Sequence, residues 1–147
     1  MILENFFFAL LATLGYCIVF NVPKKYLLLS SFGGAIGWIT YVSFNSYLDS
    51  PVTAVFIASS IVGLWGEILS VKIKDLVTIF IIPGIIPLVP GSGMYYTALA
   101  IADQDFEQAA ATGSETLFIA ITIASGIILV SSLSRLIRGR KIMSIKH

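Results

Sequence analysis

The chain has 147 residues, of which 57% are hydrophobic and 12% are charged. Soluble domains carry about 25% charged residues, so this chain has too little polar surface to cover a globule in water. Its formal net charge of +1 offers no basic patch of the kind that binds nucleic acid. The composition predicts an integral membrane protein in which residues 1–147 form a single transmembrane domain, and it argues against a soluble enzyme.

Side chains that bind metals are scarce. Cys17 is the single cysteine, which excludes an internal disulfide and a cysteine-only zinc site. His147, the only histidine, is the last residue of the sequence. The sequence contains no Walker loop, nucleophile elbow or zinc motif. We therefore expect no catalytic residue, no metal site and no bound cofactor.

Five apolar stretches are long enough to cross a membrane as helices, which takes about 20 residues for about 30 Å of hydrocarbon. The first has no positive charge before it and no Ala-x-Ala site after it, so we expect a retained helix and not a signal peptide. The last can begin earlier, because residues 105–115 are also compatible with a helix. The predicted all-α fold has five transmembrane helices joined by short connections, which favour antiparallel neighbours. The spans are Ile2–Phe20, Leu27–Phe44, Val52–Val71, Leu76–Ile101 and Leu117–Ile137.

Charged residues segregate on the two sides of these five spans. All nine basic residues lie between spans one and two, between spans three and four, or at the C-terminal end. The opposite side receives acidic residues such as Glu4, Asp49 and Asp103. Cytoplasmic loops are the ones enriched in Lys and Arg. The pattern predicts an N-terminus outside the cell and a cytoplasmic C-terminus.

The fourth span contains a segment that departs from a regular helix. Three prolines and three glycines fall within residues 83–93. Proline removes a backbone donor and clashes with the preceding turn. Non-helical backbone at membrane depth is tolerated where protein buries it or a water-filled cavity adjoins it. We expect this segment to lie inside the assembly beside a polar path. The alternative is a proline-kinked helix whose glycines are only structural.

After this break the chain can restart as a half-helix over Met94–Ile101. The first amides of a helix lack intrahelical acceptors, and the helix dipole adds a partial positive charge there. Ser92 can cap the half-helix or contact a ligand. The segment is therefore a candidate carboxylate site, by the logic of transporters with broken helices. The candidate substrate-binding residues are Pro83, Gly84, Pro87, Pro90, Gly91, Ser92, Gly93, Tyr95, Tyr96 and Thr97.

Glu67 is the second candidate functional residue. It lies in the third span, about one helical turn from the end predicted to be cytoplasmic. A carboxylate inside a membrane is costly and points to function, so Glu67 is a candidate proton carrier. The alternative is that Glu67 reaches the cytoplasmic interface or pairs with Lys74.

Small and aromatic residues on the second and third spans are expected to serve packing. Small residues let neighbouring helices approach closely. We assign this packing role, in preference to ligand contact, to Gly33, Gly34, Gly37, Gly63 and Gly66. Trp38 and Trp65 are expected to be packing residues or interface anchors.

Two segments of the sequence carry a resemblance to a known family. Phe20-Asn21-Val22-Pro23 follows the first span, and Ile82-Pro83-Gly84-Ile85-Ile86-Pro87-Leu88-Val89-Pro90-Gly91 lies in the fourth. Both resemble the bacterial threonine/serine exporter family, and the second is the more specific. Asp105-Phe106-Glu107 followed by a last helix with Gly126 also fits, so the resemblance runs along almost the whole chain. The position before Leu76, often proline in that family, is Asp75 here.

Members of that family occur as one long chain or as two polypeptides, and this chain is similar to the small C-terminal half. The resemblance implies the small subunit of a secondary exporter of L-threonine and L-serine in the bacterial plasma membrane, with a larger membrane subunit as partner. We expect the proton gradient to drive export. Three alternatives stay open: a subunit of a succinate-type dicarboxylate exporter, a scaffold for the larger partner, and a homo-oligomeric pore. The remaining expected partners are membrane lipid and the small carboxylate or amino-acid substrate.

Overall fold

The computed structural model describes residues 2–144 and the side chains of residues 2–137. Lys146 of the predicted basic tail and His147 lie outside the described residues. The described part of the chain is all-α, as predicted. Its elements are α1 (Ile2–Val19), the 3₁₀ turn η1 (Lys24–Tyr26), α2 (Leu27–Leu48), α3 (Pro51–Ile73), α4 (Thr78–Ile85), the 3₁₀ turn η2 (Ile86–Leu88), α5 (Gly91–Ala102) and α6 (Phe106–Ser144).

Four helices within the described residues are long and apolar enough to cross a membrane, or up to five if the broken pair counts as one span. The four contain α1, α2, α3 and the part of α6 up to Ile137. In the broken pair, the stretch Thr78–Leu88 is bent by 58° relative to α5. The predicted break in the fourth span is therefore confirmed. The orientation in the membrane stays a prediction.

One predicted helix start is wrong, and another takes its earlier option. The helix after the break begins at Gly91 and not at Met94, because the Pro90 carbonyl already accepts the Met94 amide at 3.1 Å. The last helix begins at Phe106, ahead of the predicted span. Asp105 fixes that start, since its side chain accepts the Gln108 amide at 3.1 Å as N-cap residues do.

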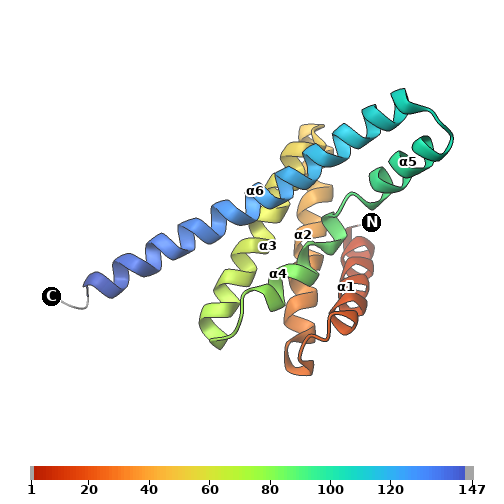
Figure 1. The fold of residues 1–147 in the computed structure, drawn as a ribbon. Coiled ribbons are helices and arrows are strands. Elements are labelled where there is room, and N and C mark those ends of the chain that lie inside the picture. The colour runs from red at the N-terminus through yellow and green to blue at the C-terminus, as the bar shows by residue number, and fades with distance from the viewer. Residues whose placement is uncertain (1, 145–147) are drawn as a thin grey trace.

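Helices α1, α2 and α3 pack side by side, and α4 lies against α2 and α3 (Figure 1). The long α6 crosses α3, and α5 packs on the first part of α6 (Figure 1). Left-handed residues end four of the helices and turn the chain: Asn21, Asp49, Lys74 and Gln104. Consecutive helices are thus neighbours as expected, except for α4 and α5 on the two sides of the break, and α6 packs on both α5 and α3.

Glycines allow the close packing of the helices around α2 and α3. A carbon atom added at Gly34 would collide with Thr13 of α1, and one at Gly37 would collide with Val62 of α3. The other predicted packing glycines are also in contact with neighbouring helices: Gly33 with Trp65, Gly63 with α6, and Gly66 with Ile81 of α4. The packing role predicted for these five glycines is confirmed.

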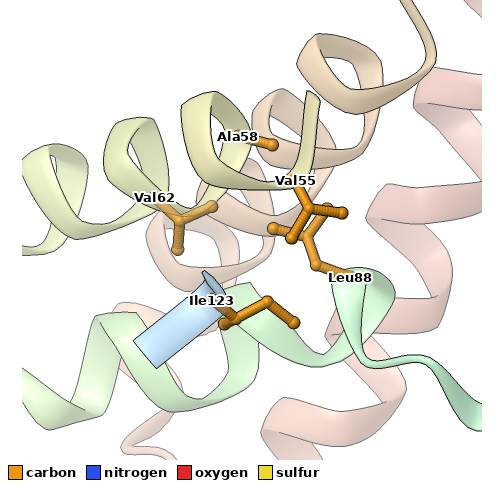
Figure 2. Packing of buried hydrophobic residues seen from close by; sticks show 5 residues of the cluster. All are labelled: Val55, Ala58, Val62, Leu88 and Ile123. Atoms are coloured by element: carbon orange, nitrogen blue, oxygen red, sulfur yellow. The ribbon is translucent and has the colours of Figure 1, made fainter. Parts of the chain in front are cut away.

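Two buried apolar clusters hold the α4–η2 segment at its two ends. Figure 2 shows the first, in which Val55, Ala58 and Val62 of α3 meet Leu88 of η2 and Ile123 of α6. The second contains Tyr26, Leu69 and Phe80. The Tyr26 and Phe80 rings meet edge to face with centroids 5.5 Å apart. The start of α4 is therefore fixed against the α1–α2 turn, and its end against α3 and α6.

Pro83 removes the amide that would otherwise bond to the Ile79 carbonyl in an α-helix. Ser30 of α2, which is fully buried, donates its hydroxyl to that carbonyl at 3.1 Å. A buried carbonyl without a partner would cost free energy comparable to a lost hydrogen bond. The side chain of a neighbouring helix therefore compensates for the proline in α4.

Pro87 and Pro90 are accommodated within the segment itself. Each removes the amide that would bond the carbonyl four residues earlier, at Pro83 and Ile86 respectively. The Pro83 carbonyl instead accepts the Ile86 amide, and the Ile86 carbonyl accepts the Val89 amide at 3.1 Å. These shorter-range bonds form the tight turn η2 and satisfy the backbone at the break.

Asp75 joins the α3–α4 turn to the α1–α2 turn. Its carboxylate accepts the Tyr26 hydroxyl at 2.8 Å and the Leu76 amide at 2.8 Å, while its carbonyl accepts the Ser70 hydroxyl at 2.7 Å. The Leu76 amide, followed by the Tyr26 hydroxyl, holds the pKa of Asp75 below its ordinary value. The residue that stands where the family often has proline therefore fixes the approach to α4 by hydrogen bonds.

Candidate functional site

The break between η2 and α5 borders a cavity of about 380 Å³, which we call the break cavity. This volume lies within the range of about 300–1,000 Å³ that small-molecule sites occupy. Its walls come from α2, α3, α6 and the break segment. The lining residues are Trp38, Tyr41, Val55, Pro87, Leu88, Val89, Pro90, Gly91, Ser92 and Ile119.

Four of the ten residues proposed from the sequence line this cavity: Pro87, Pro90, Gly91 and Ser92. Pro83 and Gly84 are instead buried inside α4. A carbon atom added at Gly84 would lie 2.9 Å from a methyl group of Val62 and 3.6 Å from the Gly34 nitrogen. Gly84 is therefore at a close approach of α4 to α2 and α3, and it does not line the break cavity.

The remaining four proposed residues lie on α5, outside the lining of the cavity. Gly93 faces α6, because a carbon atom added to it would collide with Thr116. The Thr97 hydroxyl donates to the Gly93 carbonyl at 2.7 Å. Tyr95 and Tyr96 are 63% and 55% exposed. Gly93 and Thr97 are four residues apart, which puts both on the helix face that packs against α6.

The backbone amides at the start of α5 are polar groups that lie at the break. Gly91 is the first residue of α5 and Pro90 is its cap residue. Ser92 is the second helical residue and does not cap the helix, so the capping role considered for it is wrong. Because the Met94 amide bonds to Pro90, the amides of Ser92 and Gly93 precede the intrahelical bonds of α5. Ser92 itself is exposed at the cavity.

Trp38 and Tyr41 of α2 line the cavity, although sequence reasoning gave Trp38 only a packing or interface role. Their ring centroids are 5.5 Å apart with planes inclined at 36°. Residues three apart share a helix face, so this spacing signalled an aromatic face on α2. Nothing in the spacing indicated that the break segment would lie opposite it. Trp65, in contrast, has the predicted packing role and donates to the Leu29 carbonyl at 2.9 Å.

Glu67 is 6% exposed and lies between α3 and α6. It accepts a hydrogen bond from the Ser134 hydroxyl of α6 at 2.9 Å. Both residues line a groove of about 450 Å³ whose other walls are apolar except for Lys72. The carboxylate is therefore buried at the contact between α3 and α6. Its depth in the membrane stays a prediction.

Glu67 and the break cavity lie at different levels of the bundle. From Val55, which lines the cavity, Glu67 is about 18 Å away along α3 at 1.5 Å per residue. Helix α6 reaches the same two levels, because its residue Ile119 lines the cavity and its residue Ser134 contacts Glu67. The two candidate sites share no lining residue, but the α3–α6 pair reaches both.

Comparison with known proteins agrees with the resemblance read from the sequence. Residues 5–133 match the family described as Threonine/Serine exporter, ThrE. An uncharacterized protein of Haemophilus influenzae is 28% identical over 137 residues, which cover 87% of this chain and 46% of that protein. The chain thus spans about half the length of this relative. No solved structure matches. The chain belongs to the threonine/serine exporter family.

Proposed function

We propose that this chain is the small subunit of a secondary exporter of small carboxylates, with L-threonine and L-serine as substrates and the proton gradient as the driving force. The observation that carries this proposal is the break cavity, in a chain whose family is the threonine/serine exporters. The expected location is the bacterial plasma membrane, with the basic loops on the cytoplasmic side.

Substrate binding in this proposal uses the start of α5. A carboxylate at the cavity wall accepts hydrogen bonds from the Ser92 and Gly93 amides and is favoured by the positive end of the α5 dipole. The exposed Ser92 hydroxyl supplies a further donor. Trp38 and Tyr41 form the opposite wall, where the Tyr41 hydroxyl can meet a substrate hydroxyl. A short hydroxy amino acid fits this cavity, because its carboxylate can bind at the start of α5 and its hydroxyl can meet the Tyr41 hydroxyl.

A larger membrane subunit completes the exporter. The match covers 46% of the Haemophilus influenzae relative, and in this proposal the partner corresponds to the remaining part of that length. The exposed apolar side chains of α5, among them Met94, Tyr95 and Leu99, face this partner or membrane lipid.

Glu67 carries the coupling proton in this proposal. Protonation of its carboxylate changes the hydrogen bond from Ser134 and so the contact between α3 and α6. Since Ile119 of α6 and Val55 of α3 both line the break cavity, a shift between these helices alters the cavity walls. The proton site thus acts on the substrate site through two packed helices.

The test is flux of L-threonine and L-serine in proteoliposomes containing this chain alone or with its larger partner, across an imposed pH gradient. Gly91→Leu fills the break cavity without a packing clash, because nothing lies within 4 Å of a carbon added at Gly91. We expect it to reduce flux at least tenfold while assembly persists. Gly15→Leu is the matched control, since Gly15 of α1 also has open space beside it.

Each alternative predicts a different result in this assay. A scaffold subunit leaves flux unchanged in Gly91→Leu, and a homo-oligomeric pore conducts without the partner and without regard to the gradient. A dicarboxylate exporter subunit moves succinate in place of the two amino acids. Any of these results would replace the proposal.

Glu67→Gln tests the coupling role separately. It keeps a hydrogen-bond acceptor for Ser134 but cannot carry a proton. We expect exchange of substrate to continue while acceleration by the pH gradient is lost. Ser134→Ala removes the hydrogen bond through which Glu67 acts on α6, so its flux should also depend less on the gradient. If Glu67→Gln responds to the gradient like the unmodified chain, Glu67 is not the proton carrier.

A further inference from the structure

A second cavity, of about 260 Å³, lies at the opposite end of α4 from the break cavity. We call it the turn cavity, because the α1–α2 turn forms one wall and the first part of α4 forms the other. Its lining residues are Phe20, Asn21, Val22, Pro23, Thr78, Ile79, Ile82 and Pro83. The two segments that carry the family resemblance, far apart in sequence, thus meet at this cavity.

Asn21 and Thr78 are the polar side chains of the turn cavity, one on each wall. Asn21 has a left-handed φ of 53°, and its own amide bonds to the Ile18 carbonyl at 3.0 Å. Backbone groups therefore end α1, and the Asn21 carboxamide is not needed for capping. Among the described residues, neither the Asn21 nor the Thr78 side chain has a hydrogen-bond partner.

The availability of the Thr78 hydroxyl is unusual in this chain. Threonine hydroxyls in helices commonly bond to the carbonyl four residues earlier. Such bonds are made here by Thr13, Thr40, Thr97, Thr112, Thr116 and Thr122. Thr78 begins α4 and instead lies exposed at the cavity. Its hydroxyl can donate to and accept from a ligand.

The chemistry of the walls selects the class of ligand. All eight lining residues are uncharged, and a carboxamide together with a hydroxyl offers both donors and acceptors. The carboxamide oxygen can accept from the ammonium of an amino acid and the hydroxyl can donate to its carboxylate. The two opposite charges of such a zwitterion also offset each other, so it needs no charged partner in the walls. A dianion would require charged partners to offset its desolvation. The volume of about 260 Å³ is below that of drug-sized sites.

Packed side chains separate the turn cavity from the break cavity. The barrier is the middle of the α4–η2 segment, where Gly84 packs against Val62 and Gly34. Figure 2 shows Val62 and Leu88 within the same buried cluster, and Leu88 also lines the break cavity. Pro83 lines one cavity and Pro87 the other. The break segment therefore lies between two solute-sized spaces.

We propose that the turn cavity is a second binding site for the same small zwitterionic amino acids, on the basic side of the chain. A solute occupies it with Asn21 and Thr78 as hydrogen-bond partners, and the Gly84–Val62 contact separates it from the break cavity. This proposal rests on the proposed function for the identity of the solute, but it concerns a different set of residues.

Single-cysteine labelling tests the turn cavity directly. Cys17, the single cysteine, is buried and fully shielded from solvent, so Cys17→Ser provides a background without thiols and retains a partner for Ser31. Ile82→Cys is then introduced, with Phe20→Cys as a second variant from the other wall. Both residues line the cavity and are exposed, and Asn21 and Thr78 stay in place. Ser114→Cys is the matched control, because Ser114 is exposed on α6 and lines neither cavity. Labelling by a hydrophilic maleimide is timed with and without excess L-serine.

We expect L-serine to slow labelling of Ile82→Cys and Phe20→Cys at least threefold, and to leave Ser114→Cys unchanged. Succinate should protect neither cavity variant. If both label at the same rate with L-serine in a preparation that transports it, the second site does not exist. If flux is absent but L-serine still protects, the site stands and the proposed function fails. Protection by succinate alone would overturn the ligand class.

Discussion

Helices α4 and α5 come from one apolar stretch of sequence, yet the structure treats its two halves differently. In α4, four of eight residues are buried, packed against α2 and α3. In α5, Ala100 alone of twelve residues is buried, and the helix packs mainly on α6. The break therefore divides the stretch into a largely buried helix, α4, and a largely exposed helix, α5. The break cavity lies where the two halves meet.

The largest expected effect is a difference in stability between two variants, each of which adds one leucine to one half of the stretch. Gly84→Leu inserts a side chain where even one carbon atom is too close to Val62, and overpacking of this kind costs about 3 kcal/mol. Gly91→Leu adds the same side chain to open space, so we expect a change within about 0.5 kcal/mol. Denaturant unfolding in detergent micelles measures both. Equal losses of stability would show that α4 is no more tightly packed than α5.

A smaller effect is expected from the hydrogen bond that joins α4 to α2. Ser30→Ala leaves the part-buried Ile79 carbonyl without its donor, which costs about 1 kcal/mol. Ser46→Ala is the control, because the exposed Ser46 bonds only to the Val42 carbonyl of its own helix. Pro83→Ala restores a backbone amide to Ile79, so the cost of Ser30→Ala should shrink in that background.

A double-mutant cycle with Ser30→Ala and Pro83→Ala tests this prediction quantitatively. An interaction between Ser30 and Pro83 appears as non-additive changes in the free energy of unfolding. If the two substitutions are additive, the serine does not compensate for the proline, and the account of how α4 tolerates Pro83 is wrong.

The smallest effect concerns the pH dependence of the approach to α4. Bonds from Leu76 and Tyr26 hold the pKa of Asp75 below its ordinary value. A carboxyl whose pKa is lower in the folded state adds stability above its unfolded pKa, and this is lost as pH falls through the folded value. Asp75→Asn should therefore lower the melting temperature slightly at neutral pH and not in strong acid. A constant difference across that range would contradict the assignment.

Much of this fold follows from sequence patterns. Apolar length predicts the spans, and Pro83, Pro87 and Pro90 predict the break, because proline has a fixed local effect on a helix. The paired glycines of α2 and α3 predict close helix packing, since only small residues permit it. The start of the helix after the break was misplaced by three residues, because cap geometry depends on the ψ angle of Pro90 and not on composition.

The candidate site was predicted less well than the fold. Pro87, Pro90, Gly91 and Ser92 line the break cavity, but Gly93 and Thr97 face α6 instead. Side chains on a short helix are assigned to a face only when the neighbouring helix is known. For the same reason Trp38 and Tyr41 were missed, since their role depends on which segment packs opposite α2.

The bond from Ser30 to Ile79 has a consequence for the evolution of this family. A serine at position 30 is useful where position 83 is proline, because the proline deprives Ile79 of its amide. A homologue that replaces the proline would relieve selection on the serine, and one that loses the serine first would carry an unpaired carbonyl. We therefore expect positions 30 and 83 to covary, although 53 residues separate them in the chain.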